Sequence, residues 1–490
     1  MPAFAFDNSY TRLPERLFAP ARPAGASEPF MFAFNSQLAE DLGLDVSWLE
    51  QNGAAIFSGS TSPEGAANIA MVYAGHQFGQ FNPQLGDGRA MLLGEVVSPQ
   101  GRRYDIQLKG SGPTLFSRNG DGRAALGPVM REYIVSEAMH ALGVPTTRSL
   151  AAVATGDAVY RETALPGAVV TRVATSHIRV GTFQYFAARQ DVEAVKALAD
   201  HAIARHYPEL EGREHPYLGL LQAVIRRQAA LIAKWMGIGF IHGVMNTDNM
   251  AISGETIDFG PCAFLDVYSA RKVFSSIDRN GRYAYANQPA IGQWNLARLA
   301  EALLPLINED QEAAVAAANT AITGYGEIFQ DEWMTVMRAK LGLGEARESD
   351  LTLIQSLLSM MEEGQADFTR TFRALYTVAQ SDAADAAFRS EFADPQKAQS
   401  WLNDWRDRTA EDSIEPTVRA EQMRNTNPAI IPRNHRIEEA IRAAEDDGDF
   451  SLFGALHAAL ADPYSDRPEF ERYQAAPLPH EEVPRTFCGT

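Results

Sequence analysis

The chain has 490 residues, of which 46% are hydrophobic, and its formal net charge is −19. A chain of this length exceeds one ordinary hydrophobic core, so we expect two packed lobes or a domain with large elaborations. The acidic balance argues against nucleic acid and against an anionic membrane surface as partners. No basic stretch followed by an apolar run opens the chain, and no segment approaches the ~18 apolar residues of a membrane span, so a cytoplasmic protein is expected.

The predicted elements run from strands in the first part of the chain to helices in the second. Residues 1–65 mix turns with one short helix, which the pattern places at 36–43. The patterns that follow predict strands at 89–97 and 103–109, a helix at 127–142, and strands at 149–154 and 168–173. From about residue 191 to about residue 460 apolar residues recur at helical spacing, as in Leu221, Ile225, Gln228, Ile232 and Trp235.

This order predicts an α+β protein with two lobes and a ligand cleft between them. We expect an N-terminal extension at residues 1–65, packed on a strand-rich N-lobe at residues 66–190. A helical C-lobe at residues 191–460 and an extended tail at residues 461–490 follow. Element order alone fits many proteins, so the prediction of function depends on the motifs.

Two glycine-rich turns have nearly the same sequence, Gly86-Asp-Gly-Arg-Ala and Gly120-Asp-Gly-Arg-Ala. Glycine lets backbone N–H groups approach phosphate oxygens, and the adjacent arginine adds a bidentate donor. The alternative is a pair of hairpin turns, because Asp-Gly is a strong turn signal. The second copy is the better candidate, since it runs into a helix start at Gly127 and helix N-termini attract anions.

Lys109 ends the predicted strand Tyr104–Lys109, on the same face as Asp105 and Gln107. A lysine in this position can contact a nucleotide phosphate, as the strand lysine of a protein kinase does. Such a lysine needs an acidic partner, and the next helix offers Glu132 and Glu137, of which at most one faces it. Periodicity does not choose between them, and a solvated surface lysine is the alternative.

The segment His242-Gly-Val-Met-Asn-Thr-Asp-Asn249, followed by Asp258-Phe-Gly260, matches the spacing of the kinase pattern H-R-D-L-x-x-x-N and D-F-G. Asn249 and Asp258 are therefore candidate ligands of a metal that bridges nucleotide phosphates. The kinase base would stand at Val244, and valine cannot accept a proton. Either the chain binds nucleotide without catalysis or Asp248 serves as the base, a capping role being the alternative for Asp248.

Arg172 and Arg179 stand out in a region with few arginines. Two guanidinium groups near a nucleotide could hold a pyrophosphate bidentately, which points to a leaving group of two phosphates. Surface ion pairs are the alternative.

Several motifs together resemble the SelO (selenoprotein O, YdiU) family over almost the whole chain. They are Gly75–Phe81, Gln84–Ala90, Asp105–Gly112, His242–Met250 and Asn427–His435. The resemblance implies a protein-kinase-like fold and a protein adenylyltransferase that binds ATP in a flipped orientation. It further implies that AMP is attached to Ser, Thr or Tyr hydroxyls of proteins and that pyrophosphate leaves.

Carried onto this chain, the resemblance makes Lys109 a phosphate-binding lysine paired with Glu132. It makes Asp248 the base, and Asn249 and Asp258 the ligands of Mg²⁺ or Mn²⁺. It places the flipped phosphates on Arg172 and Arg179. Further nucleotide contacts are implied for the turn residues Gly86, Gly88, Arg89, Asp121 and Gly122.

The family also suggests a role for the two cysteines, Cys262 and Cys488. Many members carry a cysteine or selenocysteine near the C-terminus that can pair with one near the active site, which would tie the tail across this region. In those members the internal cysteine lies farther downstream, and Val273–Asp278 contain none here. Two unrelated thiols in a reducing compartment are the alternative.

Protein adenylylation is the favoured function, and the expected partners are proteins that bear acceptor hydroxyls. We expect the chain to be a monomer. Transfer of UMP from UTP would use the same fold and metal site. A true kinase is disfavoured by Val244. A non-catalytic nucleotide-binding pseudokinase would have little use for Asn249 and Asp258.

Overall fold

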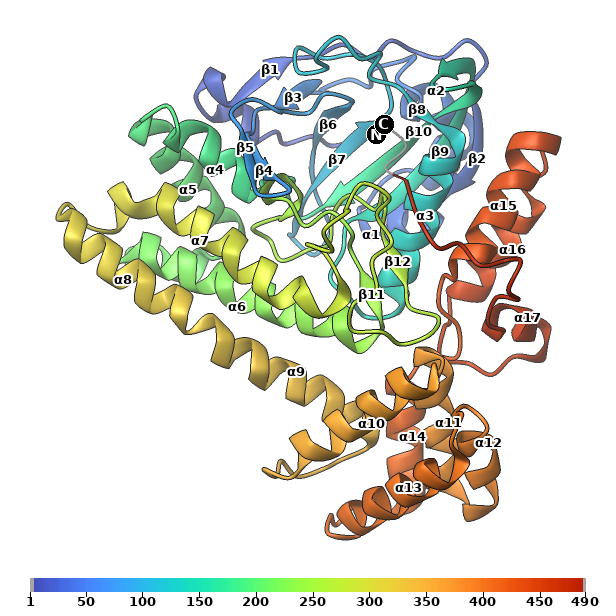
Figure 1. Cartoon of the computed structure of the whole chain (residues 1–490). Helices are drawn as coiled ribbons and strands as arrows, with labels where there is room; N and C mark the ends of the chain where they lie inside the picture. Colours follow the sequence, from blue (N-terminus) through green and yellow to red (C-terminus); the bar gives the residue numbers. More distant parts are fainter. Residues whose placement is uncertain (1–3, 488–490) are drawn as a thin grey trace.

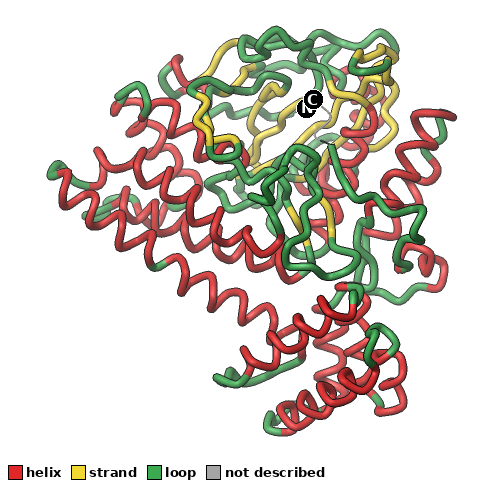
Figure 2. The backbone as a smooth tube through the Cα atoms, in the orientation of Figure 1, coloured by secondary structure: helices red, strands yellow, loops and turns green. Residues whose placement is uncertain are grey.

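The computed structural model describes residues 4–487 and shows an α+β protein. The strands gather in one region, and helices make up most of the rest of the chain (Figure 2). The predicted change from strands to helices is therefore present. In the view of Figure 1 the sheet occupies the upper part and the long helices α6, α7 and α9 lie below it.

Within the described residues, eight strands form one antiparallel sheet with the order β1-β3-β6-β7-β10-β9-β2, and β8 pairs with β10. Two two-stranded sheets, the hairpin β4–β5 and the pair β11–β12, lie outside it. The strands are β1 (Phe18–Pro20), β2 (Phe30–Phe34), β3 (Ile69–Met71), β4 (Gly75–Gln77), β5 (Gln80–Asn82), β6 (Ala90–Val97), β7 (Arg103–Lys109), β8 (Ala124–Ala125), β9 (Arg148–Tyr160), β10 (Ala164–Ala174), β11 (Phe240–Ile241) and β12 (Ala263–Phe264).

The helices follow the sheet in the chain, except for the first three, which lie among its strands in sequence. They are α1 (Ser36–Asp41), α2 (Val46–Phe57), α3 (Leu126–Ala141), α4 (Val180–Ala187), α5 (Val192–His206), α6 (Pro216–Gly237), α7 (Gln288–Ile307), α8 (Gln311–Thr323), α9 (Tyr325–Leu341), α10 (Asp350–Gly364), α11 (Phe368–Gln380), α12 (Asp385–Arg389), α13 (Pro395–Ala410), α14 (Pro416–Thr426), α15 (Asn434–Asp447), α16 (Ser451–Leu460) and α17 (Glu471–Gln474).

The alternation predicted for strand β7 decides what each face of the sheet contacts. Ile106 and Leu108 are fully buried in a cluster with Leu49 and Phe57 of α2. The opposite face of β7 carries Lys109, together with polar side chains that bind other polar groups. Because side chains alternate along a strand, burying the two apolar residues on one side directs Lys109 to the other.

Helix α3 connects the sheet to the helical region. It packs on β9 and β10, and Met130 and Ile134 share one buried cluster with Phe259 and with Ile441 of α15. Arg131 of the same helix reaches Asn434 at 3.0 Å and Glu438 at 2.8 Å, both on α15. The helix is buried on nearly every side, which fixes the acidic residues that it carries.

The region before residue 66 is more ordered than its sequence predicts. The sequence predicts only the helix at 36–43 in this region, whereas the structure also has helix α2, within which Asn52 and Gly53 lower helix propensity. Burial of Leu49, Ile56 and Phe57 against the sheet outweighs that cost. The side chain of Asp45 accepts a hydrogen bond from Trp48 N and so caps the N-terminus of the helix.

The tail after α16 is mostly irregular, with the short helix α17 as its main regular element. Near its end Thr486 forms a parallel bridge with Ser275, and its hydroxyl donates to the carbonyl of Pro261 at 2.5 Å. The tail therefore reaches the loop that follows Asp258. None of the helices in the described part of the chain combines the length and the hydropathy that a membrane crossing requires.

Candidate active site

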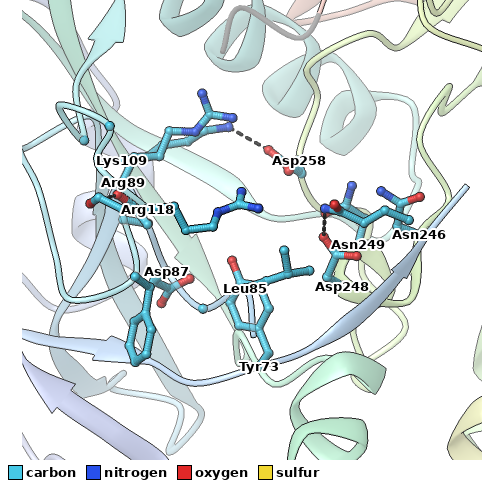
Figure 3. Close-up of a pocket in the computed structure, with 18 of the residues that line it drawn as sticks. Tyr73, Leu85, Asp87, Arg89, Lys109, Arg118, Asn246, Asp248, Asn249 and Asp258 are labelled. Atoms are coloured by element: carbon cyan, nitrogen blue, oxygen red, sulfur yellow. Dashed lines mark hydrogen bonds and ion pairs between the residues drawn. The ribbon is translucent and has the colours of Figure 1, made fainter. Parts of the chain in front are cut away.

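A cavity of about 710 Å³ lies between the sheet and the loops that follow α6, a volume in the range of nucleotide pockets. Predicted site residues line it from both sides: Gly86, Gly88, Arg89, Lys109, Asp121, Gly122, Arg172, Arg179, Asp248, Asn249 and Asp258. In Figure 3, Lys109, Arg89 and Arg118 lie across the cavity from the loop that carries Asp248, Asn249 and Asp258. Residues far apart in the sequence are thus brought into one site.

Four charged side chains meet at the inner end of the cavity. Lys109 Nζ lies 2.6 Å from Glu132 Oε2 and 2.6 Å from Asp258 Oδ1, and Arg172 bonds the same two carboxylates. Burial by itself would raise the pKa values of Glu132 and Asp258, but the two cations outweigh it and lower both. Glu132 is therefore the partner of Lys109. Glu137 instead bonds Arg148 at 2.7 Å, away from the cavity.

Asp258 stands in a backbone conformation that is uncommon for residues other than glycine. Its φ is +70°, in the left-handed region, which costs a non-glycine residue on the order of 1–3 kcal/mol unless its surroundings impose it. The strain points Oδ1 at Lys109 and Arg172. Across the described residues, Oδ2 accepts no hydrogen bond, and the side chain is 23% exposed, so this oxygen is available to a ligand.

The oxygen donors at this site fit a hard divalent cation. The Asn249 side chain is oriented by its Nδ2, which donates to Val244 O at 3.0 Å, and both Asn249 and Asp258 line the cavity. Mg²⁺ is usually held by one or two such side chains together with substrate phosphates. Among the described residues, no group of three or more His, Cys, Asp or Glu side chains could hold a metal ion.

Asp248 is buried beside the metal-binding candidates. Burial raises its pKa from 3.8 to about 6, although the nearby Arg179 guanidinium opposes the shift. Oδ2 accepts a hydrogen bond from Gln77 Nε2 at 3.2 Å, while Oδ1 is buried with no partner among the described residues. A buried carboxylate with one unpartnered oxygen and a pKa near neutrality suits a proton acceptor.

The hairpin β4–β5 determines the position of Asp248. His76 N donates to Thr247 Oγ1 at 2.7 Å, and Phe78 N donates to Asn246 Oδ1 at 3.1 Å. At Gly75 the Asp248 carboxylate lies so close that a Cβ would fall 2.4 Å from Oδ1. The motif Gly75-His-Gln thus lets the hairpin backbone pack closely against Asp248, the candidate base, and gives it one hydrogen bond.

Replacement of Gly75 with Ala is expected to lower activity at least about 100-fold while the protein stays folded. The added methyl must displace Asp248, and an error near 1 Å at a reacting group costs this much. Gly454→Ala on α16 is the control, because a Cβ there meets nothing within 4 Å and its backbone is not in the left-handed region. Steady-state rates beside thermal unfolding curves measure the effect. Equal activity of the two variants would show that Asp248 does not need this placement.

The arginines fall into two groups. Arg172 and Arg179 are buried and bind other residues of the chain. Arg172 bonds the carboxylates of Glu132 and Asp258, and Arg179 donates a hydrogen bond from Nη1 to Asp248 O at 2.8 Å. Arg89 and Arg118 line the cavity with no ion pair or side-chain hydrogen bond in the described part of the chain. They are the guanidinium groups with donors to spare for a ligand. Sequence reasoning missed Arg118, which has no motif signal of its own.

The two glycine-rich turns contact each other through the loop that joins them. A Cβ at Gly86 would fall 2.3 Å from the ring of Phe116, and one at Gly122 would fall 2.1 Å from Gly112 O. Gly86 and Gly122 also have φ values of +75° and +64°. The glycines are therefore required by the close packing of these loops, whose outer surface lines the cavity.

The helix start at Gly127 does not offer an anion site to a ligand, contrary to expectation. Gly127 N donates to Glu445 Oε1 of α15 at 3.2 Å. The N-terminus of α3 does attract a negative group, as helix dipoles do, but the chain supplies that group itself. In the second turn, Asp121 forms an ion pair with Arg161 at 2.8 Å.

Of the predicted redox pair, Cys262 is fully buried and Cys488 lies outside the described residues. The Cys262 thiol donates to Phe259 O at 3.3 Å, and burial raises its pKa to about 12. Since the thiolate is the reactive form, Cys262 is a poor nucleophile in this conformation. The pairing stays a prediction.

Comparison with known proteins gives one consistent result. A family model described as "Protein adenylyltransferase SelO" matches residues 2–461. A "Protein nucleotidyltransferase YdiU" of Rhizobium etli (strain CFN 42) is 62% identical over 488 residues, covering 100% of this chain and 98% of that protein. The protein of the same name from Rhizobium meliloti (strain 1021) is 62% identical over 490 residues, which cover 100% of each chain. The protein of the same name from Agrobacterium fabrum is 60% identical over 486 residues, which cover 99% of each chain. The chain therefore belongs to the SelO family, the family of the YdiU protein nucleotidyltransferases.

Proposed function

We propose that the protein transfers AMP from ATP to Ser, Thr or Tyr hydroxyls of other proteins and releases pyrophosphate, with Mg²⁺ or Mn²⁺ as the cofactor. The observation that carries the proposal is the position of Asp248. A buried carboxylate with a pKa of about 6 adjoins the oxygen donors Asn249 and Asp258 in a cavity rich in arginine. Membership of a nucleotidyltransferase family supports the same reaction class.

In the proposed reaction the acceptor hydroxyl gives its proton to Asp248 while its oxygen attacks the α-phosphorus of ATP. One oxygen–phosphorus bond forms to the acceptor, and the bond from the α-phosphorus to the bridging oxygen breaks. The electron pair leaves with pyrophosphate. Its charge would be balanced by Lys109, Arg89, Arg118 and Arg172, which line the cavity. Catalysis by this chain is then positioning and charge stabilisation, without a covalent enzyme intermediate.

A divalent cation would be held by Asn249 and Asp258 and would supply charge neutralisation between the phosphates. Lys109 and Arg172 already bind Oδ1 of Asp258, which leaves Oδ2 for the cation. Glu132 holds both cationic side chains in place from behind.

We also infer that the fold is protein-kinase-like with two lobes, the metal-binding loop lying in the helical lobe. The ion pair between Lys109 on β7 and Glu132 on α3 supports this, as does the position of Asp258 in the segment that connects the paired strands β11 and β12. His242 supports it too, since its Nε2 contacts Ile257 O at 2.9 Å beside the Asp258 loop. Val244 lines the cavity where the base of a kinase would stand, which favours Asp248 in that role.

Arg118→Ala is expected to lower kcat/KM for ATP by about 10- to 100-fold, since a charge-assisted hydrogen bond to phosphate contributes about 1.5–3 kcal/mol. Arg118→Lys should recover part of the loss, because it keeps the charge but not the fork of donors. Arg102→Ala, at an exposed turn far along the sheet from the cavity, is the control. Initial rates at varied ATP concentration measure kcat/KM for each variant. A wild-type kcat/KM for R118A would show that Arg118 does not bind phosphate.

The products distinguish the alternatives. With acceptor protein, metal and ATP, the proposal expects pyrophosphate in the same amount as modified acceptor. Orthophosphate instead would mean a kinase, and a strong preference for UTP over ATP would mean uridylylation. Nucleotide binding without any product, with a broad mixture of acceptor proteins, would mean a binding protein and would overturn the proposal.

A further inference from the structure

A basic segment, residues 268–283, reaches the cavity at Ile277, in a chain whose net charge is −19. Ile277 of this segment lines the cavity and is 58% exposed. The segment has one acidic residue, Asp278, and four basic ones, so its net charge is 4 − 1 = +3; the basic residues are Arg271, Lys272, Arg279 and Arg282. The charge of this segment is thus opposite to that of the whole molecule.

The basic side chains of this segment are not neutralised by the fold. Among the residues that the structure describes, no carboxylate lies within 4.0 Å of any of them. The carboxylate of Asp278 is used locally, because it accepts hydrogen bonds from the backbone N–H groups of Arg282 at 2.9 Å and Tyr283 at 2.8 Å. Positive charge is therefore left for a partner.

The segment is fixed beside the candidate base. Tyr283 OH donates to Asn246 Oδ1 at 2.6 Å, and Phe78 N donates to Tyr283 OH at 3.1 Å. The guanidinium of Arg282 lies 4.8 Å from the centre of the Trp294 ring, on α7. Phe81 lies on β5 of the β4–β5 hairpin, whose Gln77 bonds Asp248, and it is 41% exposed.

We propose that Phe81, Ile277, Arg279 and Arg282, here called the mouth surface, dock an acidic segment of the acceptor protein. The inference rests on the proposed function, since it concerns the polypeptide that brings a hydroxyl to Asp248. Exposed apolar side chains supply contact area, and the unpaired guanidinium groups select acidic neighbours of the acceptor residue. Screening confines electrostatics to about 8 Å at physiological salt, so this local charge outweighs the distant negative surface.

Binding can be measured without any chemistry. Fluorescent peptides with a central Ala flanked by Glu, Gln or Lys are titrated with the full chain in excess ATP, which fills the phosphate site. We expect the Glu peptide to bind at least about tenfold more tightly than the Gln peptide, and high salt to weaken it. The R279E/R282E double variant should bind the Glu peptide about tenfold more weakly than the wild-type chain. R279Q/R282Q should lose less affinity, and the exposed control R102E should lose none. Equal binding of the three peptides, or wild-type binding by R279E/R282E, would overturn the proposal.

A second arm separates this inference from the proposed function. The same peptides with Ser in place of the central Ala are incubated with ATP and metal. If the Glu peptide binds selectively but accepts no AMP, the mouth surface stands and adenylylation does not. If all three peptides are modified with the same kcat/KM, adenylylation stands and the acidic docking site does not.

Discussion

Replacing Asp248 with Asn is expected to lower the rate of nucleotidyl transfer by about 100- to 10,000-fold, the usual contribution of a general base. The amide has nearly the shape of the carboxylate and can still contact Gln77, so the fold should be kept. The unpartnered Oδ1 is where the proton of an acceptor hydroxyl would go, and the variant loses its basicity. ATP affinity should change little, since the phosphates are assigned to other residues. Transfer rates and ATP binding are measured on the same preparation.

The same residue predicts the pH dependence of the wild-type protein. Burial raises the pKa of Asp248 to about 6, and the base must be deprotonated to act. Below pH 6 the rate should therefore fall about tenfold per pH unit, and above it the rate should level off. The pH profile of kcat/KM tests this. A wild-type rate that stays flat from pH 5 to pH 8, or an Asp248→Asn variant with the same inflection, would assign the base elsewhere.

Asp258→Asn is expected to reduce activity by about 1,000-fold, a loss of about 4 kcal/mol of transition-state stabilisation. The substitution keeps the size of the side chain but removes the charge that binds a cation, and it leaves Lys109 and Arg172 with Glu132 alone. The apparent affinity for Mn²⁺, followed by calorimetry in the presence of ATP, should weaken in parallel.

The matched control is Glu137→Gln on helix α3. Glu137 is also a buried carboxylate in an ion pair, with Arg148 at 2.7 Å, but it does not line the cavity. This variant should lose stability and keep its response to Mn²⁺. If Glu137→Gln and Asp258→Asn weaken Mn²⁺ binding equally, Asp258 is a structural residue and the metal is held elsewhere.

Patterns with a short period predicted much of the fold and part of the site. Strand alternation placed Lys109 on the polar face of β7, and the structure confirms this placement. The helical spacing from Leu221 to Trp235 matches the buried face of α6. These predictions succeed because the period of a strand or helix fixes which side chains share a face, whatever the rest of the chain does.

The remaining features depend on contacts between distant residues. Glu445 occupies the N-terminus of α3 although it lies 318 residues from Gly127 along the chain. Gln77 reaches Asp248 across 171 residues, and Arg118 enters the cavity from a loop in which it and Asn119 adopt φ values of +49° and +69°. Loop conformations of this kind are set by tertiary packing, so no local pattern could have assigned Gln77 and Arg118 their places in the site.

The most direct test uses ATP labelled at the α-phosphate in one reaction and at the γ-phosphate in another, with acceptor protein, metal, and Asp258→Ala as the negative control. The account predicts that acceptor protein retains label only from the α-position and only with the wild-type chain. Retention of the γ-label instead would contradict it, because Asp248 and the arginines would then serve the transfer of phosphate and not of AMP.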